Sequence, residues 1–398
     1  MKKIAIVTAT RAEYGLLSPV IKELRKYENI QLRIETVVTG THLSEKYGNT
    51  VEEIKNDGVR IDHQVEISTK SDSERDISCN QAEALIKFTD LFLQQRYSAV
   101  ILLGDRYETL AMAIAAGNTG TPIFHLCGGD TTEGAIDEWI RHSITKMSYL
   151  HFVTNAESRK RVIELGENPN RVFNYGSTSI DNIINVATMS KTEALESVEL
   201  DDCKYALCTY HPVTMENNCI DNQMCSFIEV IKSFPEIQFI VTKSNADQGG
   251  ARINDILDRE MEKIENLHVF TSLGIRRYLS LMRYAEFVLG NSSSGIIEAP
   301  VFHIPTVNIG DRQRGRLQPE SVINCLPDTD SINEAIRIAL SNGFRKVCSN
   351  VRNPYGDGHA AEKIAKKTIE FVESGNIDLK KTFFDVCNSV IIKGDIDK

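Results

Sequence analysis

The sequence predicts an α/β protein with two doubly wound parallel-sheet domains in tandem, facing a cleft. Short β-branched runs alternate with longer amphipathic segments, as in a parallel sheet with crossover helices, and this series occurs twice. The 398 residues are too many for one ordinary core and suit two domains of ~100–200 residues each. Hydrophobic residues make up 41% and charged residues 25%, which is enough apolar material for two cores and too much for a disordered chain.

The first series fills the N-terminal part of the chain. Its strand candidates are nearly continuously apolar, as expected for strands that helices cover on both faces. These strands are expected at 3–8, 31–39, 59–66, 99–104, 122–126 and 150–154. Helices are expected between them at 18–27, 77–96, 107–116, 137–146 and 156–165, with a capped turn at 50–53.

The second series follows a less regular region at 180–202. Its strands are expected at 205–209, 238–242, 268–270, 287–290 and 306–309, with helices such as 276–284 and 331–340 between them. We therefore expect a first Rossmann-like domain at 1–178, a second at 179–374 and an unassigned tail at 375–398. Ligands of such sheets bind beyond the carboxyl ends of the strands, so the functional residues are expected just after strands.

Composition excludes several classes of function. The formal net charge of -10 gives no overall basic field for a nucleic-acid backbone. No stretch approaches the ~18–20 apolar residues of a membrane span, and the apolar run at 4–7 is too short for a signal peptide. The nine cysteines are scattered without a C-x-x-C pair, and the nine histidines lack an H-x-x-x-H pattern, so no metal site is expected. We expect a cytoplasmic protein with reduced thiols and no nucleic-acid or membrane partner.

Two strand ends in the first domain carry charged groups. Arg11 follows the first strand, where it would contact a ligand or form a salt bridge at a helix terminus. Asp105 and Arg106 follow the strand at 99–104, and Asp105 would cap the next helix whether or not it is also catalytic. No G-x-G-x-x-G fingerprint occurs between a strand and a helix, so bound NAD is not expected and we predict no cofactor.

A third strand end is dense in carboxylates. Asp130, Glu133, Asp137 and Glu138 fall within nine residues, interleaved with glycines. Clustered carboxylates raise one another's pKa, which makes a general acid or base usable near neutral pH. The alternative is a solvated acidic loop, with Arg141 and His142 pairing to these acids along the helix.

Two strand ends in the second domain complete the set. Pro212 restricts His211 to an extended conformation, which would present its imidazole to the cleft. The serine run at 292–294 between a strand and a helix would offer N–H groups, hydroxyls and a helix dipole to a diphosphate, with Glu298 on a ribose. Arg312, Arg314 and Arg316 add a local cationic patch to an acidic protein.

Assembled in order, these segments resemble the UDP-N-acetylglucosamine 2-epimerase family, and more closely its hydrolysing, NeuC-type branch. The residues that carry the resemblance are ATRAEYG, VTGTHLSEKYGNT, LGDRYE, GGD…IDE…IRHSITKMS, HPVT, GNSSSGIIE and NIGDRQRGR. The resemblance implies a GT-B-like fold in which the second domain binds UDP. It also implies an elimination of UDP to a 2-acetamidoglucal, followed by hydration, in a homodimeric enzyme.

The resemblance also implies roles for individual residues. Ser292, Ser293 and Arg11 would bind the diphosphate, Glu298 would bind the ribose, and Arg312 would bind a phosphate or a neighbouring sugar group. Arg106 is also expected among the residues that bind the substrate or UDP. The amino sugar would be surrounded by catalytic groups, namely His42, Asp105, Asp130, Asp137 and His211. The non-hydrolysing branch has an acidic residue where this chain has Cys127, which favours hydrolysis.

Three alternatives stay open at this stage. The substrate could be UDP-N-acetylglucosamine, on the way to sialic acid, or UDP-N,N′-diacetylbacillosamine, on the way to legionaminic acid. The sequence does not rank the carboxylates as the base at C2. Two hypotheses from other functional classes are a retaining GT-B glycosyltransferase and a non-catalytic UDP-sugar sensor. The crowded carboxylates favour the epimerase over the sensor, because a sensor needs no general base.

Overall fold

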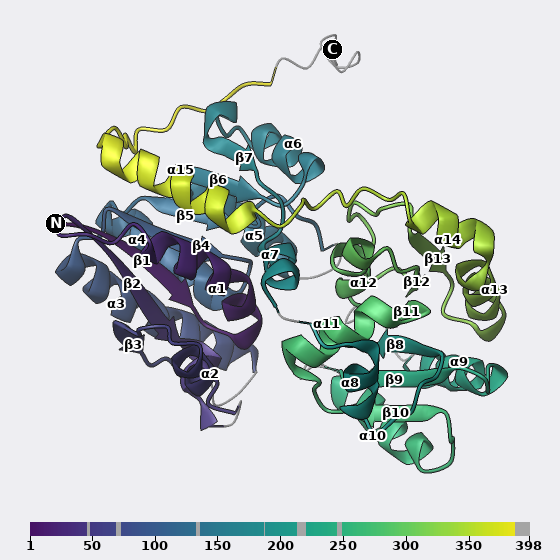
Figure 1. The fold of residues 1–398 in the computed structure, drawn as a ribbon. Coiled ribbons are helices and arrows are strands. Elements are labelled where there is room, and N and C mark those ends of the chain that lie inside the picture. Colours follow the sequence, from purple (N-terminus) through teal and green to yellow (C-terminus); the bar gives the residue numbers. More distant parts are fainter. Residues whose placement is uncertain are drawn as a thin grey trace, which may run out of the picture. The chain divides into compact units, whose positions relative to one another are not determined.

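The computed structural model describes residues 1–45, 48–68, 73–132, 136–186, 188–212, 220–244 and 249–386. Its contacts divide the chain into two compact units, each built on one parallel sheet (Figure 1). Unit 1 comprises Met1–Asp130, Trp139–Tyr175 and Ala361–Lys398, and unit 2 comprises Thr131–Glu138 and Gly176–Ala360. The expected α/β fold with two parallel sheets is confirmed.

The sheet of unit 1 has seven parallel strands in the order β3-β2-β1-β4-β5-β6-β7. The strands are β1 (Lys2–Thr8), β2 (Leu32–Thr39), β3 (His63–Val65), β4 (Ala99–Leu103), β5 (Ile123–Leu126), β6 (Leu150–Val153) and β7 (Val172–Asn174). The central strands are buried on both faces, as their continuous apolar sequences predict.

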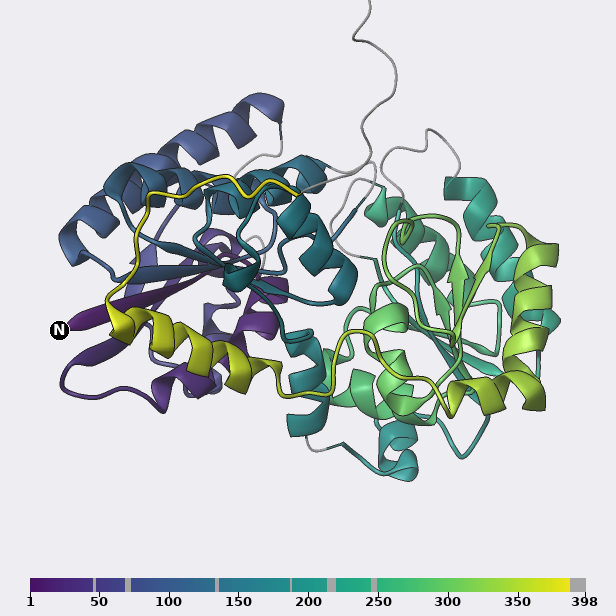
Figure 2. The ribbon, with the colours of Figure 1, turned by 90° about the horizontal axis from the view of Figure 1, so that it is seen from above.

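Helices cover both faces of this sheet (Figures 1 and 2). They are α1 (Arg11–Arg25), η1 (Gly40–Leu43), α2 (Val51–Asn56), α3 (Glu74–Gln95), α4 (Tyr107–Thr119), α5 (Ile136–Met147), α6 (Ala156–Glu164), η3 (Pro169–Arg171) and α15 (Ala360–Ser374). One core beneath α3 and α4 joins Phe88 and Met112 to Val100 of β4. Helix α1 begins at Arg11 rather than at 18 as expected, so Pro19 lies inside it, eight residues after its first residue.

The sheet of unit 2 has six parallel strands in the order β10-β9-β8-β11-β12-β13. The strands are β8 (Tyr205–Thr209), β9 (Gln238–Thr242), β10 (Leu267–Phe270), β11 (Phe287–Gly290), β12 (Thr306–Ile309) and β13 (Val322–Cys325). The helices are α7 (Thr178–Asn185), α8 (Lys191–Glu196), α9 (Ile220–Ser233), α10 (Gly250–Met261), α11 (Gly274–Tyr284), α12 (Ser294–Ile297), η4 (Ala299–Phe302), α13 (Thr329–Leu340) and α14 (Asn342–Cys348). Phe227, Phe239 and Phe287 fill the core on the α9 side of the sheet.

The two strands that the sequence analysis did not name lie at the edges of their sheets. Strands β7 and β13 are last in their sheets and are only partly buried, so they lack the continuous apolar signal of central strands. Helix α15 was also not named, although its apolar residues recur at helical spacing, with Ile364, Ile369 and Val372 buried. Its side chain Phe371 contacts Tyr149 and Phe173 of unit 1, edge to face.

The segment after α15 also packs on unit 1. Lys381 donates to the carbonyl oxygens of Lys146 and Ser148, and Phe384 N donates to Gly166 O at 2.9 Å. The expected domain boundaries 1–178, 179–374 and 375–398 remain a prediction, and the contacts group residues from Ala361 onward with the first sheet. The described part of the tail, as far as residue 386, therefore packs on unit 1.

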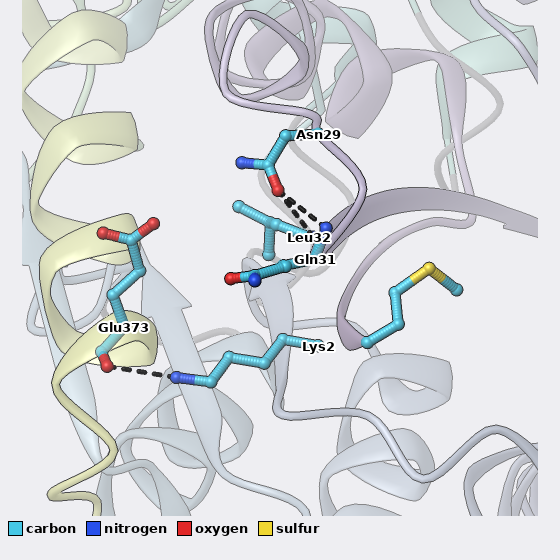
Figure 3. Close-up of a pocket in the computed structure, with 6 residues that line it drawn as sticks. Lys2, Asn29, Gln31, Leu32 and Glu373 are labelled. Atoms are coloured by element: carbon cyan, nitrogen blue, oxygen red, sulfur yellow. Dashed lines mark hydrogen bonds between the residues drawn. The ribbon is translucent and has the colours of Figure 1, made fainter.

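The amino edge of the first sheet holds the start of the chain against the end of α15 (Figures 2 and 3). Lys2 Nζ donates to Val372 O at 2.6 Å and to Glu373 O at 3.1 Å, so its charge neutralises the negative end of that helix. A hollow of about 520 Å³ beside it is lined by Met1, Lys2, Asn29, Gln31, Leu32 and Glu373. This edge lies at the amino ends of β1 and β2, opposite to the edge where ligands of such sheets bind.

Candidate functional site

The strand orders identify the point in each sheet where a ligand is expected. In unit 1 the order reverses between the neighbours β1 and β4, and in unit 2 it reverses between β8 and β11. Parallel sheets bind ligands beyond the carboxyl ends of the strands at such a switch point. The residues that follow these four strands are therefore the first candidates, and most residues chosen from the sequence lie there.

Arg11 lies at the start of α1, directly after β1. Its Nε atom is 3.0 Å from Oε2 of Glu53 on α2, and both side chains are about half exposed. The salt bridge that the sequence offered as an alternative therefore forms. Because an exposed ion pair stabilises a protein by only about 0–1 kcal/mol, Arg11 can exchange this partner for a ligand anion at small cost.

Asp105 does not cap α4, so the expected capping role is wrong. The N-cap position is occupied by Arg106, whose side chain makes no capping hydrogen bond. Instead, Asp105 Oδ2 accepts from Nη2 of Arg141, a buried residue of α5. Helix α4 begins at Tyr107, one residue later than a cap at Asp105 would require, and the turn before it contains Gly104 with a φ of +84°.

Arg141 also contacts the loop that contains Asp130. Its Nη1 donates to the backbone oxygen of Asp130 at 2.8 Å. The Asp130 carboxylate accepts from Thr154 Oγ1 at 2.7 Å and from Ser158 Oγ at 2.6 Å, all through Oδ1. Arg141 thus links two of the three candidate catalytic aspartates, which the sequence analysis had not foreseen because it placed Arg141 only in helix pairs.

The other acidic residues of this loop differ from one another in exposure and in hydrogen bonding. Asp137 lies in the first turn of α5 and is exposed, and Glu138 Oε2 accepts from Thr132 N at 2.6 Å. Glu133 lies outside the described residues. Cys127 adopts a φ of +63°, which is unusual for a residue other than glycine and places a strained backbone at the end of β5.

His42 is fully buried in η1, where both ring nitrogens face hydroxyl groups. Nε2 lies 3.0 Å from Thr8 Oγ1, and Nδ1 lies 2.7 Å from Thr50 Oγ1. Burial lowers the pKa of His42 to about 4, so the ring is neutral at pH 7. The hydroxyl of Thr50 is thereby committed to His42, and the cap predicted at the start of α2 does not form.

His125 on β5 is a second buried histidine, which the sequence analysis quoted but did not select. Nε2 of His125 lies 2.9 Å from Gly104 O, and because a carbonyl oxygen only accepts, Nε2 carries the hydrogen. Nδ1 faces Thr145 Oγ1 at 3.2 Å. Burial lowers its pKa to about 3. His125 therefore fixes the turn that precedes Asp105 as a neutral donor.

In unit 2, His211 is tied to Asn291 across the switch point. His211 N donates to Asn291 Oδ1 at 2.7 Å, and Asn291 Nδ2 donates back to His211 O at 2.8 Å. The imidazole is largely buried, with Nδ1 3.3 Å from Ser244 Oγ. Asn291 is a positioning residue that sequence reasoning missed, since nothing in the serine-rich motif distinguishes it from a turn residue.

The serine loop differs in part from its prediction. Helix α12 has only four residues before the 3-10 turn η4, so the helix dipole expected at Ser292 and Ser293 is too short to contribute much. Gly290 has a φ of +132°, and a side chain there would collide with Thr209 O on β8. The loop therefore presents hydroxyls and backbone groups to a ligand from the ends of two closely spaced strands. A helix N-terminus contributes little.

Glu298 lies in a hydrogen-bonded chain of three side chains. Tyr278 Oη is 2.9 Å from Ser294 Oγ, and Ser294 Oγ donates to Glu298 Oε2 at 2.6 Å. Burial raises the pKa of Glu298, and burial raises that of Tyr278 to about 12. A carboxyl group held in this way suits recognition of hydroxyl groups, and Tyr278 is a further residue that the sequence analysis missed.

Only one of the three expected arginines is shown to contact the serine loop. Arg312 Nη1 donates to Asn291 O at 3.1 Å, and Gln313 Nε2 donates to the same oxygen at 2.8 Å. Arg314 is exposed, and Arg316 Nε donates to Thr131 O at 3.4 Å. Within the described part of the chain, no group of three His, Cys, Asp or Glu side chains is placed to hold a metal ion.

One cluster at the β1/β4 switch point falls outside the residues chosen from sequence, apart from Arg106. Glu13 of α1 and Glu108 of α4 are both buried, and Arg106 Nε is 3.4 Å from Glu108 Oε1. Oε1 of Glu13 and Oε2 of Glu108 have no hydrogen-bond partner among the described residues. Both glutamates stood in quoted motifs, ATRAEYG and LGDRYE, but the sequence analysis gave neither of them a role.

Similarity to known proteins covers nearly the whole chain. The family profile described as UDP-N-acetylglucosamine 2-epimerase matches residues 22–369. Polysialic acid biosynthesis protein P7 of Escherichia coli is 36% identical over 390 residues, covering 97% of this chain and 98% of that protein. GDP/UDP-N,N′-diacetylbacillosamine 2-epimerase (hydrolyzing) of Campylobacter jejuni is 37% identical over 389 residues, covering 97% and 99%.

Solved structures share the fold at low identity. UDP-GlcNAc 2-epimerase from Neisseria meningitidis bound to UDP-GlcNAc has a TM-score of 0.79 and 20% identity, covering 93% of this chain and 100% of that one. The lipopolysaccharide outer core galactosyltransferase WaaB has a TM-score of 0.51 and 11% identity, covering 93% and 100%. These likenesses support the GT-B-like architecture alone. None of the helices in the described ranges combines the length and hydropathy needed to span a bilayer.

Proposed function

This chain belongs to the UDP-N-acetylglucosamine 2-epimerase family and is a hydrolysing UDP-sugar 2-epimerase, and we propose that it converts UDP-N-acetylglucosamine and water to N-acetylmannosamine and UDP. The observation that supports this most is the contact of Arg141 with both Asp105 and Asp130 beyond the first sheet. One buried cation thus pairs with the Asp105 carboxylate and fixes the backbone beside the Asp130 carboxylate, and two carboxylates positioned in this way are suited to general acid and base chemistry.

The proposed reaction has two steps. A base removes the proton at C2 while the bond between C1 and the diphosphate oxygen breaks, and UDP leaves with the bonding electrons to give a 2-acetamidoglucal. Water then adds its oxygen to C1, and a proton is delivered to C2 from the opposite face. The product is a free sugar of inverted configuration at C2, for use in sialic acid synthesis.

We assign the sugar chemistry to residues of unit 1 together with Asp137 and His211, which belong to unit 2. Asp105, Asp130 and Asp137 are the proposed acid and base groups. His42 is neutral and hydrogen-bonded at both nitrogens, so its proposed contribution is to orient Thr8 at the end of β1 rather than to transfer a proton. The imidazole of His211, fixed through Asn291, is the proposed polar contact to the reacting sugar.

We assign the nucleotide to unit 2 and to the cations that follow β1 and β4. The hydroxyls of Ser292 and Ser293 would bind the diphosphate with Arg312, and Glu298 would bind the ribose hydroxyls. Arg11 and Arg106 would neutralise charge on the leaving diphosphate, which stabilises the transition state for its departure. The reaction as proposed needs neither a metal ion nor a redox cofactor, because the C2 proton is removed as H⁺ and no hydride is transferred.

UDP-N,N′-diacetylbacillosamine is the second candidate substrate. Two relatives at 35–37% identity, from Legionella pneumophila and Campylobacter jejuni, carry names that include diacetylbacillosamine 2-epimerase (hydrolyzing). The proposed acid and base groups would serve either sugar, because both substrates lose a proton at C2 and UDP at C1. Comparison of kcat/KM for the two substrates decides between them.

The test of the proposed function is incubation with UDP-N-acetylglucosamine in D2O without an acceptor, followed by NMR. Free N-acetylmannosamine with deuterium at C2, together with UDP, is the expected result. Return of the UDP-sugar without release of UDP would contradict hydrolysis. Supplying 2-acetamidoglucal to each aspartate variant identifies the base, because a variant that lacks only the base at C2 still hydrates the glucal. The homodimer stays a prediction, which sedimentation equilibrium tests.

A further inference from the structure

The turn between β6 and α6 fixes one oxygen of the Asp130 carboxylate. Thr154 Oγ1 and Ser158 Oγ both donate to Oδ1 of Asp130, at 2.7 Å and 2.6 Å. The two hydroxyl-bearing residues are almost fully buried, at 4% and 2% exposure, whereas Asp130 is partly exposed. Within the described part of the chain, no donor lies on Oδ2, so the two oxygens of this carboxylate differ in their surroundings.

The hydrogen atoms of this arrangement have one consistent placement. Ser158 N donates to Asn155 Oδ1 at 2.9 Å, and because a backbone N–H only donates, this contact fixes the orientation of the Asn155 amide. Asn155 Nδ2 then donates to Thr154 Oγ1 at 3.0 Å, which leaves the single hydroxyl hydrogen of Thr154 for Asp130. Two hydroxyl hydrogens therefore occupy both acceptor positions of Oδ1. A proton on Asp130 has its place on Oδ2.

The backbone around Asp130 is fixed as well. Gly129 has a φ of +79°, and a side chain there would lie 2.4 Å from Ser158 O in the first turn of α6. Arg161 of α6 donates to Gly129 O, and Arg141 donates to Asp130 O at 2.8 Å. Two consecutive backbone oxygens and one carboxylate oxygen are thus held in place, and Oδ2 is the oxygen that remains available to a substrate.

We propose that Thr154 and Ser158 are positioning residues that hold Oδ1 of Asp130, so that Asp130 takes up and releases its proton through Oδ2 alone. This inference deepens the proposed function, on which the catalytic role of Asp130 rests. The two hydroxyls do not touch the reacting atoms. A carboxylate that is free to rotate presents either oxygen to the sugar, whereas a fixed one keeps the proton-transferring atom in one place.

The inference holds for either role of Asp130 in the reaction. If Asp130 is the base at C2, the C–H bond breaks and an O–H bond forms at Oδ2. If Asp130 serves the hydration step, the proton passes between Oδ2 and water. In both cases H⁺ moves without any change of oxidation state, and Oδ1 keeps its two hydrogen bonds throughout.

The kinetic test removes each hydroxyl in turn, as Thr154→Val and Ser158→Ala, and then both. Each single variant should lower kcat about three- to tenfold and the double variant about 10²-fold, because the carboxylate then samples other orientations. KM should change by less than about twofold, since neither hydroxyl is assigned to the nucleotide. Thr154→Ser keeps the hydroxyl donor and should restore kcat to near the wild-type value.

A double-mutant cycle shows whether the hydroxyls act through this carboxylate. In Asp130→Asn, removing both hydroxyls should not lower the residual kcat further, because the positioned group is already absent. Ser331→Ala is the matched control and should leave kcat unchanged. Ser331 occupies the same position in the first turn of α13 as Ser158 does in α6, and it donates to Asp328 at 2.8 Å.

A measurement without turnover keeps this inference distinct from the proposed function. Buried hydroxyl protons held on a carboxylate exchange slowly with water, so 1H NMR should show one downfield resonance that is lost in Thr154→Val and another that is lost in Ser158→Ala. Both should move upfield in Asp130→Asn, since an amide oxygen is a weaker acceptor than a carboxylate.

Three results would overturn the inference. They are wild-type kcat in the double variant, an undiminished loss of kcat when both hydroxyls are removed from Asp130→Asn, and absence of the two hydroxyl resonances. If a variant fails to fold, which far-UV circular dichroism shows, the resonances of the wild-type protein still test the contact with Oδ1. Failure of the wild-type enzyme to release UDP would overturn the proposed function and leave these resonances unchanged.

Discussion

Arg141 contacts two of the candidate catalytic aspartates, although the sequence analysis did not choose it as a site residue. It is buried, it pairs with Asp105 and it donates to the backbone of Asp130. A guanidinium that contacts two neighbouring acidic residues fixes both in one geometry, since its donors form a planar fork. At the scale of single residues, the site therefore depends on side chains that orient the candidate acids as much as on the acids themselves.

The first prediction concerns Asp105. Replacing Asp105 by Asn should lower turnover about 10²- to 10⁴-fold, since a general acid or base is removed. The Kd for UDP should change little, because UDP binding is assigned mainly to unit 2. The Asn variant should remain folded, since Asp105 does not cap α4. A parallel loss of the folded state on thermal unfolding would show that the pair with Arg141 is mainly structural.

The second prediction concerns Tyr278. Its hydroxyl supports Ser294, which in turn donates to Glu298. Replacing Tyr278 by Phe removes one hydrogen bond worth about 0.5–1.5 kcal/mol and should weaken UDP binding several-fold. Calorimetric titration with UDP and with 2′-deoxy-UDP checks this. An equal loss for both nucleotides would contradict a role in recognition of the ribose.

At the scale of elements, the segment after α15 is attached to unit 1 by a buried ionic network. Glu167 accepts from Lys146 at 2.9 Å and His151 at 3.1 Å, and Lys381 lies 2.7 Å away. Burial alone would raise the pKa of Glu167, but the hydrogen bonds from His151, Lys146 and Lys381 outweigh it and lower the pKa to about 2. Through these four charged or polar side chains, Lys381 thus attaches the segment after α15 to unit 1.

The third prediction tests that network. Lys381→Met should lower the free energy of unfolding of unit 1 by about 1–2 kcal/mol, less than for a wholly buried pair because Lys381 is partly exposed. Lys380→Met is the matched control, since Lys380 is exposed and adjacent. Urea unfolding of both variants is the measurement. Equal midpoints would mean that the contacts of Lys381 with Glu167 and with the Lys146 and Ser148 oxygens contribute nothing to the stability of unit 1.

At the scale of the whole molecule, the two units differ in how strongly burial lowers the pKa values of their histidines. Burial lowers the pKa of His42 to about 4 and that of His125 to about 3, and it also lowers that of His151. All three histidines and Glu167 belong to unit 1. In unit 2, the described histidine with a resolved shift is His268, whose pKa burial also lowers, but it is only half-buried. Acid therefore acts mainly on unit 1.

The fourth prediction is that unit 1 unfolds first as the pH falls. Unfolded histidines take up protons below pH ~6.5, while those of folded unit 1 resist protonation, so stability is complete above this pH and is lost as the pH falls toward 3–4. Loss of the Glu167 interactions follows from pH ~4.5 toward 2. The single tryptophan, Trp139, lies in unit 1, so its fluorescence should change at higher pH than the far-UV circular dichroism of the whole chain. Coincident transitions would contradict this order.

The sequence by itself determined the two-sheet α/β fold, most central strands and the strand ends that hold the candidate residues. It could do so because buried parallel strands leave continuous apolar runs and because ligand sites follow those runs. Strands β11 and β12 lie where the apolar pattern predicted them, at 287–290 and 306–309. The family of UDP-sugar epimerases was also identifiable, since its motifs occur in order along the chain.

Only the tertiary structure decided which groups meet. Arg141 with Asp105 and Asn291 with His211 are each brought together by different strands or helices, so no spacing along the chain reveals them. The structure likewise replaced the capping role of Asp105 by an ion pair and shortened the helix after the serine loop to four residues. Local sequence sets an element and its ends, whereas proton positions and charge pairs depend on burial and on neighbours that are distant in the chain.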